Sequence, residues 1–487
     1  MADPQRPRPR KPKGFRDAFA QDCRQRQNMI DTICSVYRKY GFEQLETPCI
    51  EYVDALGKFL PEQDQPDAGV FAMKDDQDDK WLALRYDLTA PLARTIAEYG
   101  DNLPTPFRRY QYGPVWRRER KPGKDRFREF FQCDFDTVGC DSMAADAEVC
   151  LVLSEAMQAL GIDQFVIRVN NRKVLNGLLG SLAIDDPKVR LDILRTLDKL
   201  DDIGVRGVRE QLGPGRQDKS GSFNDGLNLP ESAIESVVGF LECRRDTRSE
   251  TCDAFAELVQ EGGAEGVEEL RRMETFLATS NISEDQIRFD PSLVRGLEYY
   301  TGPVFEIELP FEIKVKGKTK KFGSVAGGGR YDYLVERFTG RTVPATGASI
   351  GVDRLLAALN LMNAEAVTEI EPGPVVVTVM DQDRELEYQK IVNELRSAGI
   401  RSELYLGGRK FKAQMKYADK RNAPAVVIAG SDEFEAGTLT IKNMFLGSKL
   451  AAEVKDNEAW RKGQPAQSTI ARDQLVTTIQ AILSDER

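Results

Sequence analysis

Two neighbouring stretches decide the fold: Tyr112-Gly-Pro-Val-Trp-Arg-Arg-Glu119 and, after a short basic turn, Arg126-Phe-Arg-Glu-Phe-Phe-Gln132. Strand-like sequence extends from Pro106 to Arg118 and again from Phe127 to Asp136. The Pro-Gly pair in the intervening turn favours a reversal of the chain. We therefore predict an antiparallel hairpin with a basic loop.

Strand alternation places every second residue of the hairpin on the same face. In the second strand this face would carry Arg126, Arg128, Phe130, Gln132, Asp134 and Asp136. A planar guanidinium group can bond two oxygens of a phosphate or carboxylate, and a strand holds it more rigidly than a loop does. The face could thus bind an anionic ligand, although a solvated basic hairpin would show the same charge pattern.

The chain contains no histidine among its 487 residues. This absence excludes Ser-His-Asp triads, histidine-bound zinc and an imidazole general base. Eight cysteines are present without a Cys-x-x-Cys pair, so we expect free thiols rather than a structural metal site. Any catalysis must therefore rely on positioning of the reactants and on fixed charge.

Charge and hydropathy limit the possible partners. The net charge is −10, yet basic residues cluster at 108–128 and 401–421, and such local clustering permits nucleic-acid binding. No apolar run approaches the roughly 18 residues that a membrane helix requires. Residues 1–13 look like a disordered basic leader without the apolar core of a signal peptide. We expect a cytoplasmic protein that does not associate with membranes.

The remaining sequence divides into segments of different periodicity. A helix is expected at Asp22–Tyr40 and a short strand at Phe42–Pro48. Helical periodicity dominates Asn171–Ser280, and strand-like, glycine-rich sequence then returns, which suggests a domain interrupted by an insertion. Beyond the linker Glu369–Pro374, strands and helices alternate as in a small α/β domain with a partly parallel sheet.

Three further segments combine arginine with glycine or tyrosine: Arg295-Gly-Leu-Glu-Tyr-Tyr300, Ala326-Gly-Gly-Gly-Arg-Tyr-Asp332 and Gly347-Ala-Ser-Ile-Gly-Val-Asp-Arg354. Glycines let the backbone approach a ligand closely. The third segment reads as a strand that enters a helix, and a helix N-terminus favours an anion. Each segment alone also fits an ordinary edge strand or loop.

Together these segments resemble class II aminoacyl-tRNA synthetases, and specifically the histidyl-tRNA synthetase family. The similarity extends over nearly the whole chain after the leader. Glu43–Pro48, Trp116–Phe130 and Gly347–Arg354 are similar to the three motifs of the class, of which the first builds the dimer interface. Arg295–Tyr300 and Ala326–Asp332 are characteristic of the histidyl enzymes and are therefore the specific signal.

The resemblance implies a fold and a division of the chain. The fold would be an α+β class II catalytic core, an antiparallel sheet flanked by helices, with a helical insertion and a C-terminal α/β anticodon-binding domain. The similarity to that last domain lies in Lys416–Arg421, Val426–Gly430 and Gly437–Lys442. The expected boundaries are a leader at 1–13, catalytic parts at 14–170 and 286–366, an insertion at 171–285 and an anticodon-binding domain at 374–487.

The resemblance also implies ATP-dependent ligation of L-histidine to its tRNA by a homodimer, with Mg²⁺ bound together with ATP. A histidyl-adenylate would form with release of pyrophosphate, and transfer to tRNA would release AMP. The implied histidine-binding residues are Asp87, Thr89 and Gln132 for the α-amino group, Asp136 and Tyr300 for the imidazole, Tyr299 closing the pocket, and Arg295 over the reacting carboxylate. The implied ATP-binding residues are Arg117 for the α-phosphate, Glu119 and Phe130 for adenine, and Arg126 and Arg354 for the outer phosphates. Arg117 and Arg295 would be the catalytic residues.

The hairpin loop departs from the family pattern. It reads Arg120-Lys-Pro-Gly-Lys-Asp-Arg126, whereas common bacterial members have a shorter Arg-Pro-Gln-Lys-Gly-Arg loop that approaches the tRNA acceptor end. We therefore hypothesise that dependence on the extra 5′ nucleotide of histidine tRNA is altered or absent. Arg120 or Lys124 would then contact phosphate instead.

Three alternatives to a histidine-specific ligase remain open from the sequence. The principal one is the synthetase-like regulatory subunit of histidine biosynthesis, which lacks an anticodon domain and loses catalytic residues. The sequence after Pro374 and the intact Arg295 count against it. A purely RNA-binding pseudo-enzyme is the second, and another class II specificity, which the Tyr299-Tyr300 pair opposes, is the third.

Overall fold

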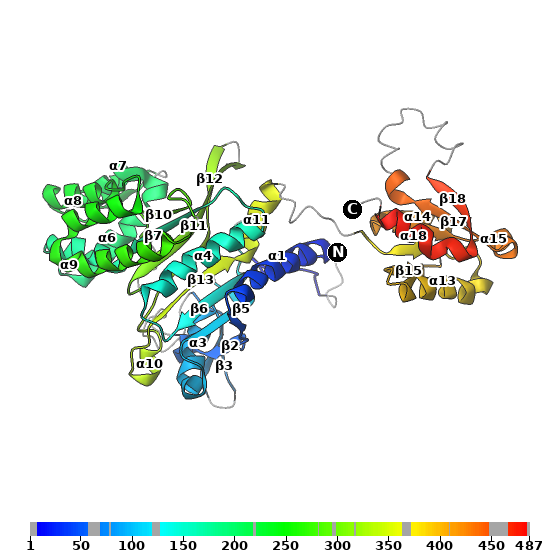
Figure 1. Ribbon diagram of the computed structural model, residues 1–487, viewed down its shortest axis with the longest axis horizontal. Coiled ribbons are helices and arrows are strands. Elements are labelled where there is room, and N and C mark those ends of the chain that lie inside the picture. The colour runs from blue at the N-terminus through cyan, green and yellow to red at the C-terminus, as the bar shows by residue number, and fades with distance from the viewer. Residues whose placement is uncertain are drawn as a thin grey trace. The chain divides into compact units, whose positions relative to one another are not determined.

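The computed structural model describes residues 7–56, 69–76, 79–118, 127–217, 221–280, 282–294, 299–315, 318–362, 372–408, 410–447 and 466–484. The chain forms two compact units, Met1–Glu369 and Ile370–Arg487 (Figure 1). Among the helices of the described residues, none combines the length and the apolar character that a membrane span requires.

The described part of the first unit contains an eight-stranded sheet with the order β1-β5-β6-β13-β12-β11-β7-β10. The strands are β1 (Glu43–Gln44), β5 (Phe107–Trp116), β6 (Glu129–Val138), β13 (Ala345–Gly351), β12 (Lys318–Arg330), β11 (Pro303–Val315), β7 (Val166–Asn171) and β10 (Ile287–Phe289). Every pairing from β5 to β7 is antiparallel, which confirms the expected core. The predicted hairpin is the β5–β6 pair.

The two edges of the sheet depart from the antiparallel expectation, because β1 runs parallel to β5 and β10 runs parallel to β7. The strand expected at Phe42–Pro48 is also shorter, and only Glu43–Gln44 pairs with β5. The carbonyls of Thr47 and Pro48 instead accept hydrogen bonds from the Arg85 guanidinium at 2.7 and 3.3 Å. The Arg85 side chain thus bonds the backbone carbonyls that would pair with β5 in a longer strand.

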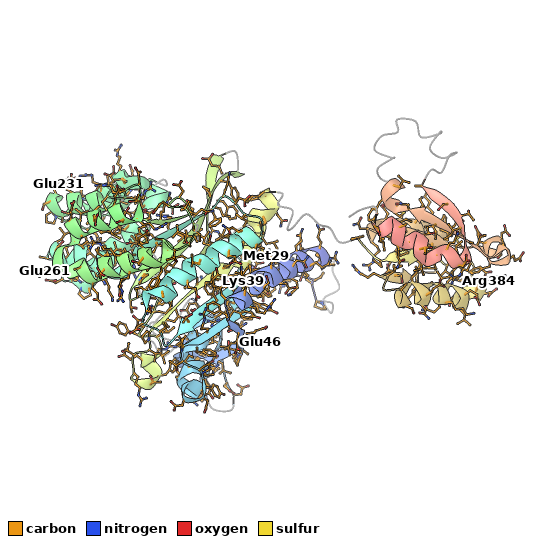
Figure 2. All side chains as sticks on the ribbon, in the orientation of Figure 1. Met29, Lys39, Glu46, Glu231, Glu261 and Arg384 are labelled. Atoms are coloured by element: carbon orange, nitrogen blue, oxygen red, sulfur yellow. The ribbon has the colours of Figure 1, made fainter. Side chains whose placement is uncertain are left out.

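Three helices cover one face of this sheet: α1 (Ala20–Lys39), α4 (Met143–Ala159) and α11 (Val352–Met362) (Figure 1). On α1, Met29 is buried, while Lys39 at the end of the helix reaches the carboxylate of Glu155 on α4 at 2.5 Å (Figure 2). The rings of Tyr37 and Phe135 lie 4.7 Å apart in this layer. Because Phe135 faces α1, the alternate residues of β6 must face the other side of the sheet.

The other side of the sheet carries smaller elements. A three-stranded sheet has the order β2-β4-β3; helix α2 packs on it, α3 packs against α2, and α10 packs against α3. Their bounds are β2 (Ile50–Tyr52), α2 (Val53–Leu56), β3 (Ala72–Lys74), β4 (Trp81–Leu84), α3 (Thr89–Tyr99), η1 (Gly100–Asn102) and α10 (Glu336–Thr339). A small apolar cluster that includes Leu92, Val138, Tyr331 and Ala345 joins α3 to the main sheet.

Helices occupy the stretch in which helical periodicity dominates. They are α5 (Arg172–Ser181), α6 (Pro187–Leu197), α7 (Leu200–Leu212), α8 (Glu231–Leu241) and α9 (Arg248–Leu277), with a short hairpin of β8 (Gly215–Gln217) and β9 (Phe223–Asp225). Their apolar residues belong to the same continuous core as those of the main sheet. This module therefore packs onto the sheet rather than around a core of its own.

The second unit is an α/β domain whose five-stranded sheet has the order β15-β14-β16-β17-β18 among the described residues. The first three strands are parallel and the last two antiparallel, which agrees with the predicted partly parallel sheet. The elements are β14 (Val375–Val377), η2 (Gln382–Arg384), α13 (Glu385–Ser397), β15 (Ser402–Leu404), α14 (Phe411–Lys420), β16 (Ala425–Ile428), α15 (Ser431–Ala436), β17 (Thr438–Asn443), β18 (Gln467–Ala471), η3 (Arg472–Gln474) and α18 (Leu475–Ser484). The sequence did not indicate α15 or β18.

Candidate active site

The centre of the candidate site is the face of β6 that points away from the α1 layer. The strand register places Gln132 between Gly113 and Gly351, Asp134 between Gln111 and Ser349, and Asp136 between Arg109 and Gly347. A Cβ atom on Gly347 would lie 2.2 Å from the Asp136 carboxylate, so only glycine leaves room for that group. The flanking glycines thus leave space above a row of polar side chains.

Two side chains from different elements contact the carboxylate of Asp136. The Arg109 guanidinium forms an ion pair with its Oδ2 atom at 2.7 Å, and the Tyr331 hydroxyl donates a hydrogen bond to Oδ1. All three side chains are almost completely buried. Burial raises the pKa of Asp136, while Arg109 and the Tyr331 hydroxyl act to lower it.

Next to this carboxylate, two acceptors of β6 lack partners. The Gln132 amide nitrogen donates to the Ser349 hydroxyl at 2.6 Å, but its Oε1 atom has no hydrogen-bond donor among the described residues. The same holds for Oδ1 of the buried Asp134. Burial raises the pKa of Asp134 to about 7, and Arg109 opposes this shift. Unsatisfied buried acceptors suit a ligand that brings N–H donors or positive charge.

The segment that enters α3 brings a further carboxylate toward this face. Asp87 Oδ1 accepts hydrogen bonds from the backbone amides of Thr89 and Ala90 at 3.2 and 2.9 Å, as an N-terminal cap of the helix does. The carbonyl of Leu88 accepts a hydrogen bond from Arg109 at 3.1 Å. Asp87 also contributes to the electrostatic environment of both Asp134 and Asp136.

Arg117 lies just beyond the end of β5. Its Nε atom donates to the carbonyl of Tyr86 at 3.1 Å, and its guanidinium carbon lies 5.1 Å from the centroid of the Phe130 ring. No carboxylate of the described residues forms an ion pair with Arg117, unlike the paired Arg109. A guanidinium that is fixed through Nε and lies beside a half-buried aromatic ring suits phosphate with an adjoining base.

The tyrosine pair lies on the same side of the sheet. The Tyr299 hydroxyl donates to the Tyr300 hydroxyl at 2.8 Å, and a Cβ on Gly329 would lie 2.8 Å from the Tyr300 ring. Burial raises the pKa of Tyr299 well above its usual range, so its hydroxyl stays protonated. Tyr299 can therefore act as a neutral hydrogen-bonding group.

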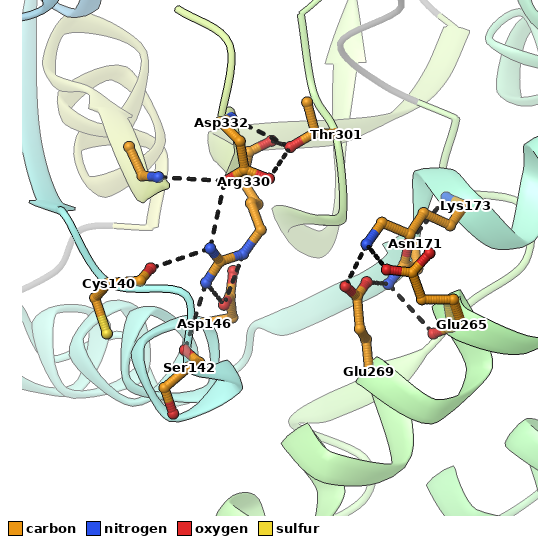
Figure 3. A network of polar contacts seen from close by, with 12 residues as sticks. Cys140, Ser142, Asp146, Asn171, Lys173, Glu265, Glu269, Thr301, Arg330 and Asp332 are labelled. Carbon is orange, nitrogen blue, oxygen red and sulfur yellow. Dashed lines mark hydrogen bonds and ion pairs between the residues drawn. The ribbon is translucent and has the colours of Figure 1, made fainter. Parts of the chain in front are cut away.

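A buried network supports the backbone after this pair (Figure 3). The Thr301 hydroxyl donates to the Asp332 carboxylate at 2.7 Å, and the Thr301 amide donates to the Arg330 carbonyl at 2.8 Å. The Arg330 guanidinium pairs with the fully buried Asp146 of α4 and donates to the Cys140 carbonyl at 3.1 Å. The glycine-rich segment thus connects the tyrosines to the helical layer.

The predicted strand-to-helix segment is β13 followed by α11, with Arg354 in the first turn of the helix. The exposed Arg354 donates to the carbonyl of Phe322 at 3.1 Å. Its neighbour Asp353 accepts a hydrogen bond from the Phe131 amide at 2.6 Å and pairs with Arg16. Arg354 therefore belongs to an element that is fixed to β6.

Eight of the residues that the sequence suggested belong to the elements around this face: Asp87, Thr89, Arg117, Phe130, Gln132, Asp136, Tyr299 and Tyr300. Arg354 lies in the first turn of α11, in the helical layer on the opposite face, and donates to the Phe322 carbonyl. Five others, Glu119, Arg120, Lys124, Arg126 and Arg295, lie outside the described residues. Among the residues that are described, no group of three or more cysteine, aspartate or glutamate side chains could hold a metal ion.

Sequence reasoning assigned no role to Arg109, Tyr331 or Ser349. Arg109 was only one member of the basic stretch, although the hairpin register, once known, places it opposite Asp136. Tyr331 was quoted within a family segment, but nothing local indicated that its hydroxyl reaches a strand 195 residues away. The position of Ser349 opposite Asp134 follows only from the pairing of β13 with β6.

An antiparallel sheet with an arginine-bearing hairpin, and a strand that runs into an arginine-bearing helix, are the features of a class II aminoacyl-tRNA synthetase. The histidyl-tRNA synthetase family matches residues 14–355, and an anticodon-binding domain matches residues 374–482. The chain belongs to the histidyl-tRNA synthetase family.

Individual relatives agree with this assignment. The histidine–tRNA ligase of Dinoroseobacter shibae is 53% identical in an alignment of 500 positions that covers 99% of each chain. The histidine–tRNA ligase of a Ruegeria species is 53% identical in an alignment of 489 positions that covers 98% of this chain and 97% of the relative. The crystal structure of histidyl-tRNA synthetase from a Nostoc species superposes with a TM-score of 0.72 at 28% identity, covering 98% of this chain and all of that one (100%).

Proposed function

We propose that this site activates L-histidine with ATP and passes it to tRNA, and that the β6 face selects the amino acid. Family membership and similarity over the full chain make the protein a class II histidine–tRNA ligase. The observation that carries the site assignment is the buried Asp136 carboxylate, which pairs with Arg109 and accepts a hydrogen bond from Tyr331 beside unpartnered acceptors of Gln132 and Asp134.

Histidine would lie across this face. Asp87, Thr89 and Gln132 would bind its α-amino group, because a carboxylate and an unpartnered amide oxygen suit an ammonium ion. Asp136 and Tyr300 would pair with the two imidazole nitrogens, and Tyr299 would close the pocket. An amino acid without these ring nitrogens would leave buried groups unpaired, at a cost of roughly 1–3 kcal/mol each.

ATP would lie at the other end of β6. Phe130 would stack on adenine and Glu119 would bind its amino group. Arg117 would hold the α-phosphate together with the histidine carboxylate, and Arg295 would lie over the same reacting groups. Arg126 and Arg354 would hold the outer phosphates, and Mg²⁺ would be bound with ATP rather than by a protein-only cluster.

This chemistry needs no histidine side chain. The substrate carboxylate is already ionised at neutral pH and attacks the α-phosphorus, and pyrophosphate leaves. The ribose hydroxyl at the end of tRNA then attacks the mixed anhydride, and AMP leaves. Aligned reactants and fixed positive charge provide the catalysis in both steps.

For tRNA recognition, we propose that the α/β unit binds the anticodon, with phosphate contacts from its basic stretch. Arg120 or Lys124 in the hairpin loop would contact the acceptor end, with altered or absent dependence on the extra 5′ nucleotide. Aminoacylation of transcripts with and without that nucleotide tests this, and strong dependence would contradict it.

The assembly and the division of the chain are also proposals. We propose a homodimer, in keeping with the exposed side chains of Ile50, Tyr52 and Met73 on the small sheet. We also propose a cytoplasmic location. We also propose a leader at 1–13, catalytic parts at 14–170 and 286–366 around an insertion at 171–285, and an anticodon-binding domain at 374–487. Sedimentation and limited proteolysis test these two points.

The regulatory alternative is not supported, because the curated relatives that match the full chain are histidine–tRNA ligases. Histidine-dependent exchange of pyrophosphate into ATP tests the proposal directly. Exchange that requires histidine supports it, and purified protein without exchange would contradict it.

A further inference from the structure

The Asp136 carboxylate has two buried partners, Arg109 and Tyr331, to which the proposed function assigns no role. Resting on the proposed function, we propose that Arg109 and Tyr331 are positioning residues for histidine recognition. They hold Asp136 as an oriented anion, whose remaining lone pairs accept an N–H group of the imidazole. Neither residue needs to touch the substrate itself.

The first support is the placement of Arg109. Its side chain is fully buried (0% exposed), and burying a guanidinium is costly unless a carboxylate and hydrogen-bond acceptors compensate. Its two contacts are the Asp136 carboxylate at 2.7 Å and the Leu88 carbonyl at 3.1 Å, and its Nε and Nη1 atoms have no partner among the described residues. Leu88 lies between Asp87 and Thr89. One guanidinium thus connects the proposed α-amino subsite with the proposed imidazole subsite.

The second support is the placement of Tyr331. Its ring is buried in the apolar cluster with Leu92 and Val138, so packing determines the direction of the hydroxyl. That hydroxyl donates to Oδ1 of Asp136, on the opposite side of the carboxylate from Arg109. The ring of Tyr331 also lies edge-on to Tyr299, with centroids 6.3 Å apart. Tyr331 is therefore built into the wall of the same pocket.

The electrostatic environment explains why Asp136 needs the contacts with Arg109 and Tyr331. Burial and the nearby Asp87 raise the pKa of Asp136, and only Arg109 and the Tyr331 hydroxyl lower it. Asp134, on the same strand, is a further carboxylate in this field, and Tyr300 interacts with Tyr331. If Asp136 took up a proton, its O–H would compete with the imidazole N–H instead of accepting from it. Arg109 and Tyr331 together therefore keep Asp136 ionised and able to accept the imidazole N–H.

Tyr331→Phe tests the inference with the smallest change, because only the hydroxyl is removed. The matched control is Tyr37→Phe. Tyr37 is equally buried and donates its hydroxyl to the Cys133 carbonyl at 3.2 Å, on the same strand but from the opposite face. Both variants lose a buried hydroxyl that contacts β6, and only one of them loses a contact with Asp136.

Pyrophosphate exchange should show a histidine KM about tenfold higher in Tyr331→Phe, with the ATP KM and kcat close to wild type. Removing the hydroxyl raises the pKa of Asp136, so Asp136 takes up a proton at a higher pH than in wild type. When the pH is lowered, the histidine KM of the variant should therefore start to rise at a higher pH than that of wild type. The profile of Tyr37→Phe should superimpose on that of wild type. Titration of the substrate imidazole is common to all three proteins and cancels in the comparison.

Arg109→Lys provides the second variant. It retains the positive charge but loses the Nη2 atom, which contacts both Asp136 and Leu88, and the shorter lysine side chain cannot replace it. The histidine KM should therefore again rise more than the ATP KM. The inference is overturned if Tyr331→Phe retains the wild-type histidine KM and pH profile, or if both tyrosine variants change equally. In either case active wild-type protein would leave the proposed function standing, whereas wild-type protein without exchange would refute the function itself.

Discussion

The backbone amide of Phe131 donates a hydrogen bond to the carboxylate of Asp353 at 2.6 Å, joining two segments 222 residues apart. The bond ties β6 to the first turn of α11, which carries Arg354. Phe130 and Arg354, the residues proposed for the two ends of ATP, therefore sit on elements that are fixed to each other.

Asp353→Ala should consequently weaken ATP binding more than histidine binding. Loss of the bond frees the start of α11 from β6, and a misplaced Arg354 would hold the outer phosphates less well. We expect a several-fold rise in the ATP KM of pyrophosphate exchange, roughly the effect of one lost hydrogen bond to a charged group. Ser349→Ala, which releases Gln132, is the matched control and should raise the histidine KM instead. Equal effects of both variants on both substrates would contradict this division of the site.

Asp136→Ala should mainly raise the histidine requirement. The variant removes the proposed imidazole acceptor, and the ATP KM should change little. It also leaves the buried Arg109 without its carboxylate, so the free energy of unfolding should fall by about 3–5 kcal/mol. Circular dichroism must therefore establish that the protein is folded before kinetics are compared. An unchanged histidine KM in folded protein would count against the placement of Asp136 at the imidazole.

Arg295→Ala should leave the fold intact and remove most of the adenylation. The proposed role of this arginine is to stabilise charge on the carboxylate and α-phosphate as they react, and such groups are typically worth a factor of about 100 or more in rate. Single-turnover formation of histidyl-adenylate is the measurement. Adenylation close to the wild-type rate would refute the role.

Asp134→Asn should stabilise the unliganded protein in a pH-dependent way. The ordinary pKa of an aspartate is 3.8, and the pKa of Asp134 in the folded protein is about 7. As the pH rises, the unfolded chain therefore loses this proton before the folded protein does. Below about pH 4 the group is neutral in both states. As the pH rises toward 7 it lowers wild-type stability, and above 7 the cost is constant. Asparagine removes this cost, which amounts to at most roughly 4 kcal/mol. Thermal midpoints at pH 5 and pH 8 provide the comparison, and an advantage of the variant that does not grow with pH would contradict the shift.

Arg330→Met should destabilise the first unit by about 3–5 kcal/mol, because it leaves the buried Asp146 without its partner. Arg330→Met combined with Asp146→Leu should recover much of the loss, since no unpaired charge then remains. Chemical unfolding of the single and double variants measures the difference. A double variant no more stable than the single one would show that the ion pair is not the main contribution of Arg330.

The local features of this site could be predicted correctly from the sequence alone. The alternation of β6 correctly placed Gln132, Asp134 and Asp136 on one face, because side chains alternate strictly along a strand. The strand-to-helix transition before Arg354 was likewise correct, since its glycines and apolar spacing are local signals.

Long-range pairing could not be predicted in the same way. The contact between Tyr331 and Asp136 depends on the order of strands in the sheet, which periodicity does not contain. The shortened β1 has a similar cause, because the Arg85 side chain takes the carbonyls of Thr47 and Pro48. In both cases a side chain from a distant segment determines the local structure.

Amino-acid-dependent pyrophosphate exchange tests the central claim most directly, because it reports activation of the amino acid without involving tRNA. The purified chain should exchange pyrophosphate into ATP with histidine and not with glutamine, proline or threonine. Asp136→Ala should require far more histidine for the same exchange. Absence of exchange with histidine, or comparable exchange with any of the other three amino acids, would contradict the account.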